Sequence, residues 1–135
     1  MAYQTINPFN NQVLNSYENI SDDQLEKVLT DSHALYLKWR DEPSETRRDT
    51  LHRIATMMRS EKTQLATTVT QEMGKLIGES EAEVELCADI ADYFADHAAE
   101  FLAHKPLDTV IGDAYYEKQA LGVLFMVEPW NFPYY

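Results

Sequence analysis

Apolar residues recur at three- and four-residue intervals over most of the chain, the spacing that gives an α-helix one apolar face. The pattern predicts a helix over 25–39 and a second helical region over 51–73, which continues or restarts after Ser60. Gly74 is suited to end that region, because glycine readily takes the left-handed conformation found just beyond helix C-termini. The best-patterned helix is predicted from about Glu79 to Ala103. The chain is therefore expected to be rich in helix.

The sequence also marks where two of these helices begin. Ser21 and Gln24 have the spacing of a capping box, in which each side chain accepts a hydrogen bond from the other residue's backbone N–H. Four glutamates cluster in the first turns of the long helix, where the helix dipole favours anions: Glu79, Glu81, Glu83 and Glu85. A cation site there is the less favoured interpretation, because alternate spacing distributes the carboxylates around the helix. A solvated turn is expected instead.

Short strands are predicted outside the helices. Tyr3–Ile6 and Gln12–Tyr17 flank a turn rich in asparagine and proline, which indicates a β-hairpin. Thr109–Ile111 and Ala114–Gln119 flank a Gly-Asp pair and predict a second hairpin. The apolar run Val123–Val127 is typical of a strand buried on both faces of a parallel sheet. The predicted fold class is α/β: helix-rich, with short hairpins and one parallel strand whose neighbours are expected beyond residue 135.

Charge and composition limit the classes of function. The 135 residues include 23 acidic and 11 basic side chains, a formal net charge of −12. That field would repel nucleic-acid phosphates and anionic bilayers, so neither is an expected partner. The one cysteine, Cys87, excludes an internal disulfide, and no signal-peptide pattern opens the sequence. A cytoplasmic protein is therefore expected.

The segment after the apolar run holds the main candidate for chemistry. Pro129-Trp130-Asn131-Phe132-Pro133 follows the predicted strand, and ligands of open α/β sheets bind just beyond the carboxyl ends of strands. Two prolines restrict this loop, so the Asn131 carboxamide would be held where it can donate a hydrogen bond to developing negative charge. From the pattern alone, a rigid turn with Trp130 in the core is the favoured alternative.

These five residues, after the run at 122–127, resemble the P-W-N-F-P motif of the aldehyde dehydrogenase superfamily. Glu72-Met73-Gly74-Lys75 resembles the E-x-G-K element that these enzymes carry upstream. The remaining similarities follow the family's order along the whole chain: Ile6-Asn7-Pro8, Trp39, Arg47, Leu51 and Glu83-Val84. Within the family, the E-M-G-K spelling and Tyr93–His97 are most similar to bacterial succinate-semialdehyde dehydrogenases. The departures touch no catalytic position: Leu76 and Ala120 replace prolines, Lys118 lies near a usual arginine, and Asn10-Asn11 replaces a turn of small residues.

The resemblance implies the N-terminal part of the aldehyde dehydrogenase fold. Residues 1–106 would form the helical part of the cofactor-binding domain, and residues 107–120 a β-hairpin of the oligomerisation arm. Residues 121–135 would contribute the first strand and the P-W-N-F-P loop of a Rossmann-like nucleotide-binding sheet. The full-length protein is expected to be a homo-oligomer.

The resemblance also implies an activity, the oxidation of an aldehyde to the carboxylic acid with NAD or NADP, with succinate semialdehyde as the expected substrate. A cysteine thiolate attacks the aldehyde, and Asn131 stabilises the oxyanion of the thiohemiacetal. Hydride transfer to the cofactor then leaves a thioester for hydrolysis. The residues implied on the nicotinamide side of the cofactor cleft are Val127, Pro129, Trp130 and Asn131.

Other chemistry-bearing side chains favour structural roles. Cys87 lies on the apolar stripe of the long helix without a basic neighbour in sequence, which favours core packing over a nucleophile. His97 and His104 could share a helical face, but no third ligand is evident, so no metal site is predicted. Glu72 and Lys75 could form a structural pair across the glycine between them.

Two functions of different classes remain open. The first is the N-terminal portion of an NAD(P)-dependent aldehyde dehydrogenase, inactive alone because the nucleophile, the general base and the phosphate-binding glycines are expected beyond residue 135. The alternative is a non-catalytic helical interaction module, or a truncated-gene product, that associates with full-length subunits. A cysteine and a glycine-rich continuation in the reading frame would favour the first, and a stop codon after Tyr135 the second.

Overall fold

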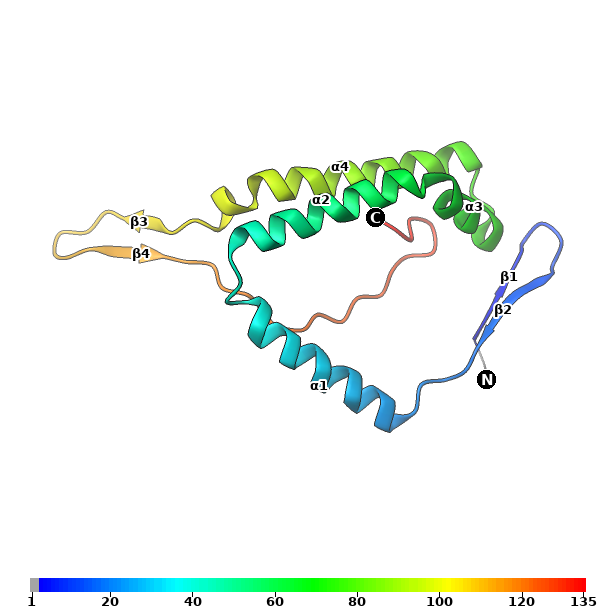
Figure 1. Ribbon diagram of the computed structural model, residues 1–135, viewed down its shortest axis with the longest axis horizontal. Helices are drawn as coiled ribbons and strands as arrows, with labels where there is room; N and C mark the ends of the chain where they lie inside the picture. Colours follow the sequence, from blue (N-terminus) through cyan, green and yellow to red (C-terminus); the bar gives the residue numbers. More distant parts are fainter. Residues whose placement is uncertain (1–2) are drawn as a thin grey trace.

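The computed structural model describes residues 3–135. Helices α2, α3 and α4 lie together as one layer, α1 lies apart from it, and the C-terminal segment runs from α1 back to the layer (Figure 1). The two hairpins project outward (Figure 1). In chain order the elements are β1 (Tyr3–Ile6), β2 (Val13–Tyr17), α1 (Asp22–Trp39), α2 (Ser44–Ser60), α3 (Lys62–Met73), α4 (Ile77–Leu102), β3 (Lys105–Leu107) and β4 (Ala114–Tyr116).

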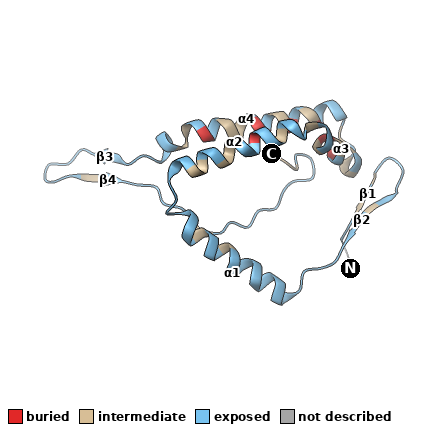
Figure 2. Ribbon diagram, viewed as in Figure 1, coloured by how far each residue is buried: buried red, intermediate tan, exposed pale blue. Residues whose placement is uncertain are grey.

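The core lies between α4 and the two helices that pack against it. Figure 2 shows the buried positions confined to α2, α3 and α4. Most of them are small, which lets the helix backbones approach closely, as the alanine-rich sequence of α4 predicts. The buried apolar residues are Ala55, Ala66, Val69, Val84, Cys87, Ala88 and Ala95.

The helix boundaries follow their sequence signals. The Ser21 hydroxyl accepts from the Gln24 N–H at 3.2 Å, and the Gln24 carboxamide accepts from the Ser21 N–H at 2.9 Å, so the capping box is confirmed. The second helical region restarts at Glu61, which separates α2 from α3. Gly74 ends α3 with φ +78°, the left-handed conformation expected of it.

Gly74 also lies against the first hairpin. A Cβ built on Gly74 would come within 3.1 Å of the Pro8 Cγ atom. Because both the left-handed backbone and this contact oppose a side chain, Gly74→Ala is expected to lower the free energy of unfolding by about 1–2 kcal/mol, measured by urea titration. Gly78→Ala is the matched control, since Gly78 lies in α4 with nothing within 4 Å of the built Cβ. A gain of up to about 1 kcal/mol is expected there, and equal losses in the two variants would contradict the argument.

The first hairpin is confirmed and the second is shifted. β1 and β2 pair antiparallel, with Tyr3 opposite Tyr17. β3 pairs with β4 with Lys105 opposite Tyr116, so the strand predicted at Thr109–Ile111 is wrong, and β4 ends three residues before the predicted Gln119. Residues 108–113 form the connecting loop, closed by a 2.6 Å hydrogen bond from the Thr109 hydroxyl to the Gly112 carbonyl. β3 contains Pro106, which an edge strand tolerates because the missing N–H of proline faces no partner strand there.

The parallel strand predicted at Val123–Val127 is not formed. These five residues have no strand pairing and are 46–93% exposed. A strand exists only where a neighbour accepts and donates its backbone hydrogen bonds, and the two described sheets, β1–β2 and β3–β4, include none of these residues. The alternative of Trp130 in the core is also wrong, because Trp130 is 77% exposed. The helix-rich fold with short antiparallel strands is confirmed.

Candidate active-site loop

A buried ion pair lies at the turn between α3 and α4. The Lys75 ammonium is 2.6 Å from a carboxylate oxygen of Glu83. The Lys75 side chain is 8% exposed and that of Glu83 is 0% exposed. The sequence left open a pair between Lys75 and Glu72, and the structure pairs Lys75 with Glu83. The glutamates of the first turns of α4 were expected to be solvated, and this expectation is wrong for Glu83, which faces the core beside Val84.

The ion pair contacts the P-W-N-F-P loop at two residues and the chain just after the loop at a third. Lys75 Nζ donates to the Asn131 backbone carbonyl at 3.1 Å and lies 3.7 Å from the centre of the Phe132 ring. The second carboxylate oxygen of Glu83 accepts from the Tyr134 N–H at 2.8 Å. We call Lys75 and Glu83, with these contacts, the loop clip. The loop clip attaches the C-terminal segment to the turn between α3 and α4, which lies 56 residues earlier in the sequence.

Local sequence explains how the clip is positioned. Gly74 turns the chain out of α3, and α4 begins at Ile77, so Lys75 lies in a tight turn. Ser80, one helical turn before Glu83, is also buried and lies 3.2 Å from the Thr70 hydroxyl across the α3–α4 contact. Ser80 and Glu83 are polar positions on the otherwise apolar face of α4. This was the sequence signal that could have predicted a buried carboxylate, because a buried polar group needs a partner.

The residues expected at the cofactor cleft form an exposed surface. Val127 is 80% exposed, and Pro129 and Asn131 are exposed as well as Trp130. The Asn131 carboxamide makes no hydrogen bond to residues 3–135, so its N–H groups are available to a ligand. An apolar surface beside a neutral amide donor can pack against one face of a flat ring. The phosphate-binding elements of a dinucleotide are not recognised in this sequence.

Cys87 is buried in α4, which confirms the core-packing interpretation. Burial raises the pKa of its thiol, and the nearby Glu83 carboxylate raises it further, while Lys75 opposes this shift. A thiol with a raised pKa is a poor nucleophile at neutral pH, because the thiolate is the reactive form.

The two histidines considered as metal ligands make separate contacts. His97 Nδ1 lies 2.8 Å from the Tyr93 carbonyl, and His104 Nε2 lies 3.0 Å from Glu117. Across residues 3–135, no three histidine, cysteine or acidic side chains gather as a metal site. Over the same residues, no helix combines the length and apolar character that a bilayer crossing requires.

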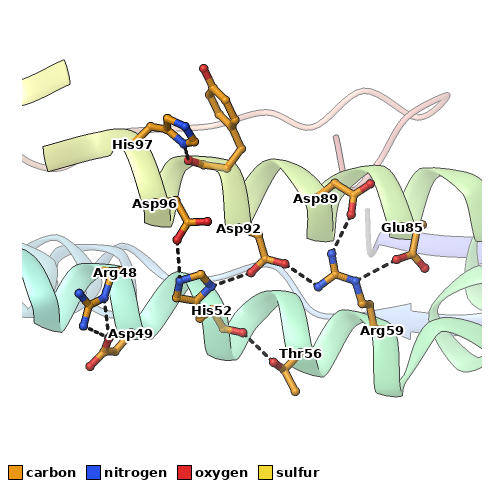
Figure 3. A network of polar contacts seen from close by, with 11 residues as sticks. Arg48, Asp49, His52, Thr56, Arg59, Glu85, Asp89, Asp92, Asp96 and His97 are labelled. Carbon is orange, nitrogen blue, oxygen red and sulfur yellow. Dashed lines mark hydrogen bonds and ion pairs between the residues drawn. The ribbon is translucent and has the colours of Figure 1, made fainter. Parts of the chain in front are cut away.

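A second polar cluster joins α2 to the exposed side of α4 (Figure 3). His52 lies between two carboxylates, 2.7 Å from Asp92 and 3.2 Å from Asp96. Two helical turns along α2, Arg59 reaches Asp92 at 2.6 Å and also binds Glu85 and Asp89. No pattern in α2 alone shows which α4 carboxylates lie opposite its basic residues.

This cluster predicts a pH dependence of stability. The hydrogen bond to Asp92, and the charge of Asp96, raise the pKa of His52 above its ordinary value of 6.5. A raised pKa in the folded state means that the protonated histidine stabilises the fold. Its contribution is complete below pH 6.5 and is lost as pH rises through the raised pKa. Urea midpoints should therefore fall from pH 6 to pH 8, and the fall should be smaller in His52→Gln. An unchanged slope in that variant would contradict the assignment.

Comparison with known proteins places these features in a family. The profile of the aldehyde dehydrogenase family matches residues 1–135. The chain belongs to the aldehyde dehydrogenase family. Within it, the chain is 30% identical to a succinate-semialdehyde dehydrogenase [NADP(+)] of Deinococcus radiodurans over 98% of this chain and 28% of that protein.

Solved structures agree with this placement. The chain is similar to a succinic semialdehyde dehydrogenase from Streptococcus pyogenes in complex with NADP+, with a TM-score of 0.95 and 52% identity over 99% of this chain. It is also similar to a betaine aldehyde dehydrogenase variant from Staphylococcus aureus in complex with NAD+, with a TM-score of 0.88 and 25% identity over 99% of this chain. The chain spans 30% and 28% of these two structures.

Proposed function

We propose that this chain is the N-terminal portion of an NAD(P)-dependent aldehyde dehydrogenase, in which Asn131 stabilises the reaction's oxyanion. The observation that carries the proposal is the exposed P-W-N-F-P loop with an unengaged Asn131 carboxamide, in a chain that belongs to this family. A neutral amide suits the task, because it donates a hydrogen bond to the developing charge without giving up its proton.

The residues of this chain would act by binding and orientation. The Asn131 N–H groups would donate to the aldehyde oxygen as a thiolate from outside residues 1–135 adds to the carbonyl carbon. Val127, Pro129 and Trp130 would form an apolar wall for the nicotinamide, which supplies the hydride acceptor when bound. We propose that the chain alone is inactive, because its one thiol, Cys87, is buried with a raised pKa.

The substrate proposal is succinate semialdehyde, and the cofactor proposal is NADP or NAD. Its support is that two of the relatives described above are named as succinate or succinic semialdehyde dehydrogenases, one of them NADP(+)-dependent and the other bound to NADP+. The NAD+ complex of the betaine aldehyde dehydrogenase keeps NAD open.

We further propose the three-part division at residues 106 and 120, a homo-oligomer and a cytoplasmic location. The projecting β3–β4 hairpin supports the homo-oligomer, since a two-stranded sheet has unpaired edges that another subunit can cover (Figure 1). The hairpin begins at Lys105, two residues before residue 107, the proposed start of the arm, so the arm would include Lys105 and Pro106.

The test is an assay of the protein encoded by the complete reading frame. With succinate semialdehyde as substrate, the full-length protein is expected to form NADPH or NADH, measured at 340 nm. The 135-residue chain alone is expected to form neither. Cys87→Ala is the control and should leave turnover within about twofold, because the thiol only packs in the core. No aldehyde oxidation by the full-length protein with any of a panel of aldehydes would overturn the proposed function and favour the interaction module.

A further inference from the structure

The loop clip contacts the backbone of the residue to which the oxyanion role is assigned. Lys75 binds the carbonyl of Asn131 and lies against the next residue, Phe132, while Glu83 binds the N–H of Tyr134. We propose that Lys75 and Glu83 are positioning residues that fix the Asn131 carboxamide in the orientation the reaction needs. This inference rests on the proposed function and adds to it a role for a buried ion pair that touches no reacting atom.

The hydrogen-bonding capacity of the pair supports this role. An ammonium has three N–H donors and no acceptor, and a carboxylate has two oxygens. Lys75 uses its donors on Glu83 and Asn131 and turns its charge toward the Phe132 ring, while Glu83 uses one oxygen for Lys75 and the other for Tyr134. With the side chains 8% and 0% exposed, water has little access to replace any of these contacts. A displacement of the loop would therefore break several charge-assisted interactions together.

Comparison with a neighbouring pair separates this role from simple helix attachment. Lys62 and Glu85 join α3 to α4 at 3.1 Å, but their side chains are 38% and 39% exposed and make no hydrogen bond or ion pair with the described loop residues. Burial of two charges is costly and seldom raises stability over an apolar pair of similar volume. The two buried charges of the loop clip therefore lie where they fix the backbone of the loop. The helices are held together by other contacts.

The double variant Lys75→Met/Glu83→Leu is designed to remove the clip and keep the fold. It replaces both charges by apolar side chains of similar length, so no buried charge is left unpaired. Lys62→Met is the matched control, since it removes another Lys–Glu contact onto α4, away from the loop. In the 135-residue chain, hydrogen exchange of the Tyr134 amide is expected to accelerate about 10-fold or more in the double variant and to stay unchanged in the control. Protection equal to wild type in a folded double variant would overturn the proposal.

The second arm measures catalysis in the full-length protein, with rates normalised to active sites by burst titration. The double variant is expected to lose about 100-fold in kcat, the order of effect that a misplaced catalytic group produces. KM for the aldehyde and for the cofactor should stay within about twofold. In the Asn131→Ala background the same double substitution should change kcat little further, because Lys75 and Glu83 act through Asn131.

The outcomes separate the two proposals. Faster Tyr134 exchange, a fall in kcat and non-additivity with Asn131→Ala together support the positioning role. Faster exchange with unchanged kcat, or an additive loss with Asn131→Ala, would overturn it. A wild-type full-length protein without dehydrogenase activity would instead overturn the proposed function, and the exchange experiment would still decide whether the clip holds the loop.

Discussion

Asn131→Ala is expected to lower kcat of the full-length protein by about 10²–10³-fold, the loss measured when one oxyanion donor is removed from other enzymes. The reason is that the carboxamide acts only once negative charge develops on the aldehyde oxygen. Its side chain makes no hydrogen bond within residues 3–135, so truncation removes no contact that supports the fold there. Steady-state kinetics at saturating aldehyde and cofactor measure the effect.

Three further measurements make the Asn131 result specific. The dissociation constant of the cofactor, from fluorescence titration, should change less than threefold in Asn131→Ala. Cys87→Ala is the control, since it changes a buried side chain of α4 and leaves the Asn131 amide in place. The free energy of unfolding should equal that of the wild type. Equal losses in turnover and cofactor binding would move Asn131 from oxyanion donor to a structural role.

Lys75→Met is expected to lower the free energy of unfolding by about 3–5 kcal/mol, because it leaves the Glu83 carboxylate buried without its cation. Glu83 retains only the Tyr134 N–H as a partner, and its side chain is 0% exposed. Urea denaturation of the 135-residue chain, followed by circular dichroism, measures the loss. Adding Glu83→Leu should recover most of it, since the unpaired charge is then gone.

The control for this prediction is again Lys62→Met, for which a change of at most about 1 kcal/mol is expected because its ion pair is solvent-exposed. Similar losses for Lys75→Met and Lys62→Met would show that burial does not distinguish the two pairs. A double variant as unstable as Lys75→Met would show that the loss comes from side-chain shape and not from the unpaired charge.

The helices were predictable because their signals are local. The capping box at Ser21, the stop at Gly74 and the three- and four-residue apolar spacing each lie within one or two turns of the helix that they define. The first hairpin has the same character, because its turn chemistry separates two short extended stretches. The second hairpin was misplaced since a Gly-Asp pair suggested a two-residue turn, whereas the loop spans residues 108–113.

The P-W-N-F-P loop could be found from sequence, but its attachment could not. Asn131 and Lys75 were both noted in motifs, and their positions in the chain are 56 residues apart. Periodicity describes one element at a time, so it cannot show that the α3–α4 turn meets the C-terminal segment. For the same reason Glu83 was expected in solvent, and the His52 and Arg59 partners on α4 were missed.

The sequence by itself determined the helical elements, the capping box of α1, the glycine stop of α3 and the family motifs, among them the asparagine that we propose as oxyanion donor. Each of these depends on side chains close together in the chain. Tertiary structure decided which charges are buried, which carboxylates pair across helices and how the loop is held. It also decided that Val123–Val127 forms no strand among residues 3–135. The physical reason is that burial and pairing belong to two segments at once, and the pattern of one segment does not specify its partner.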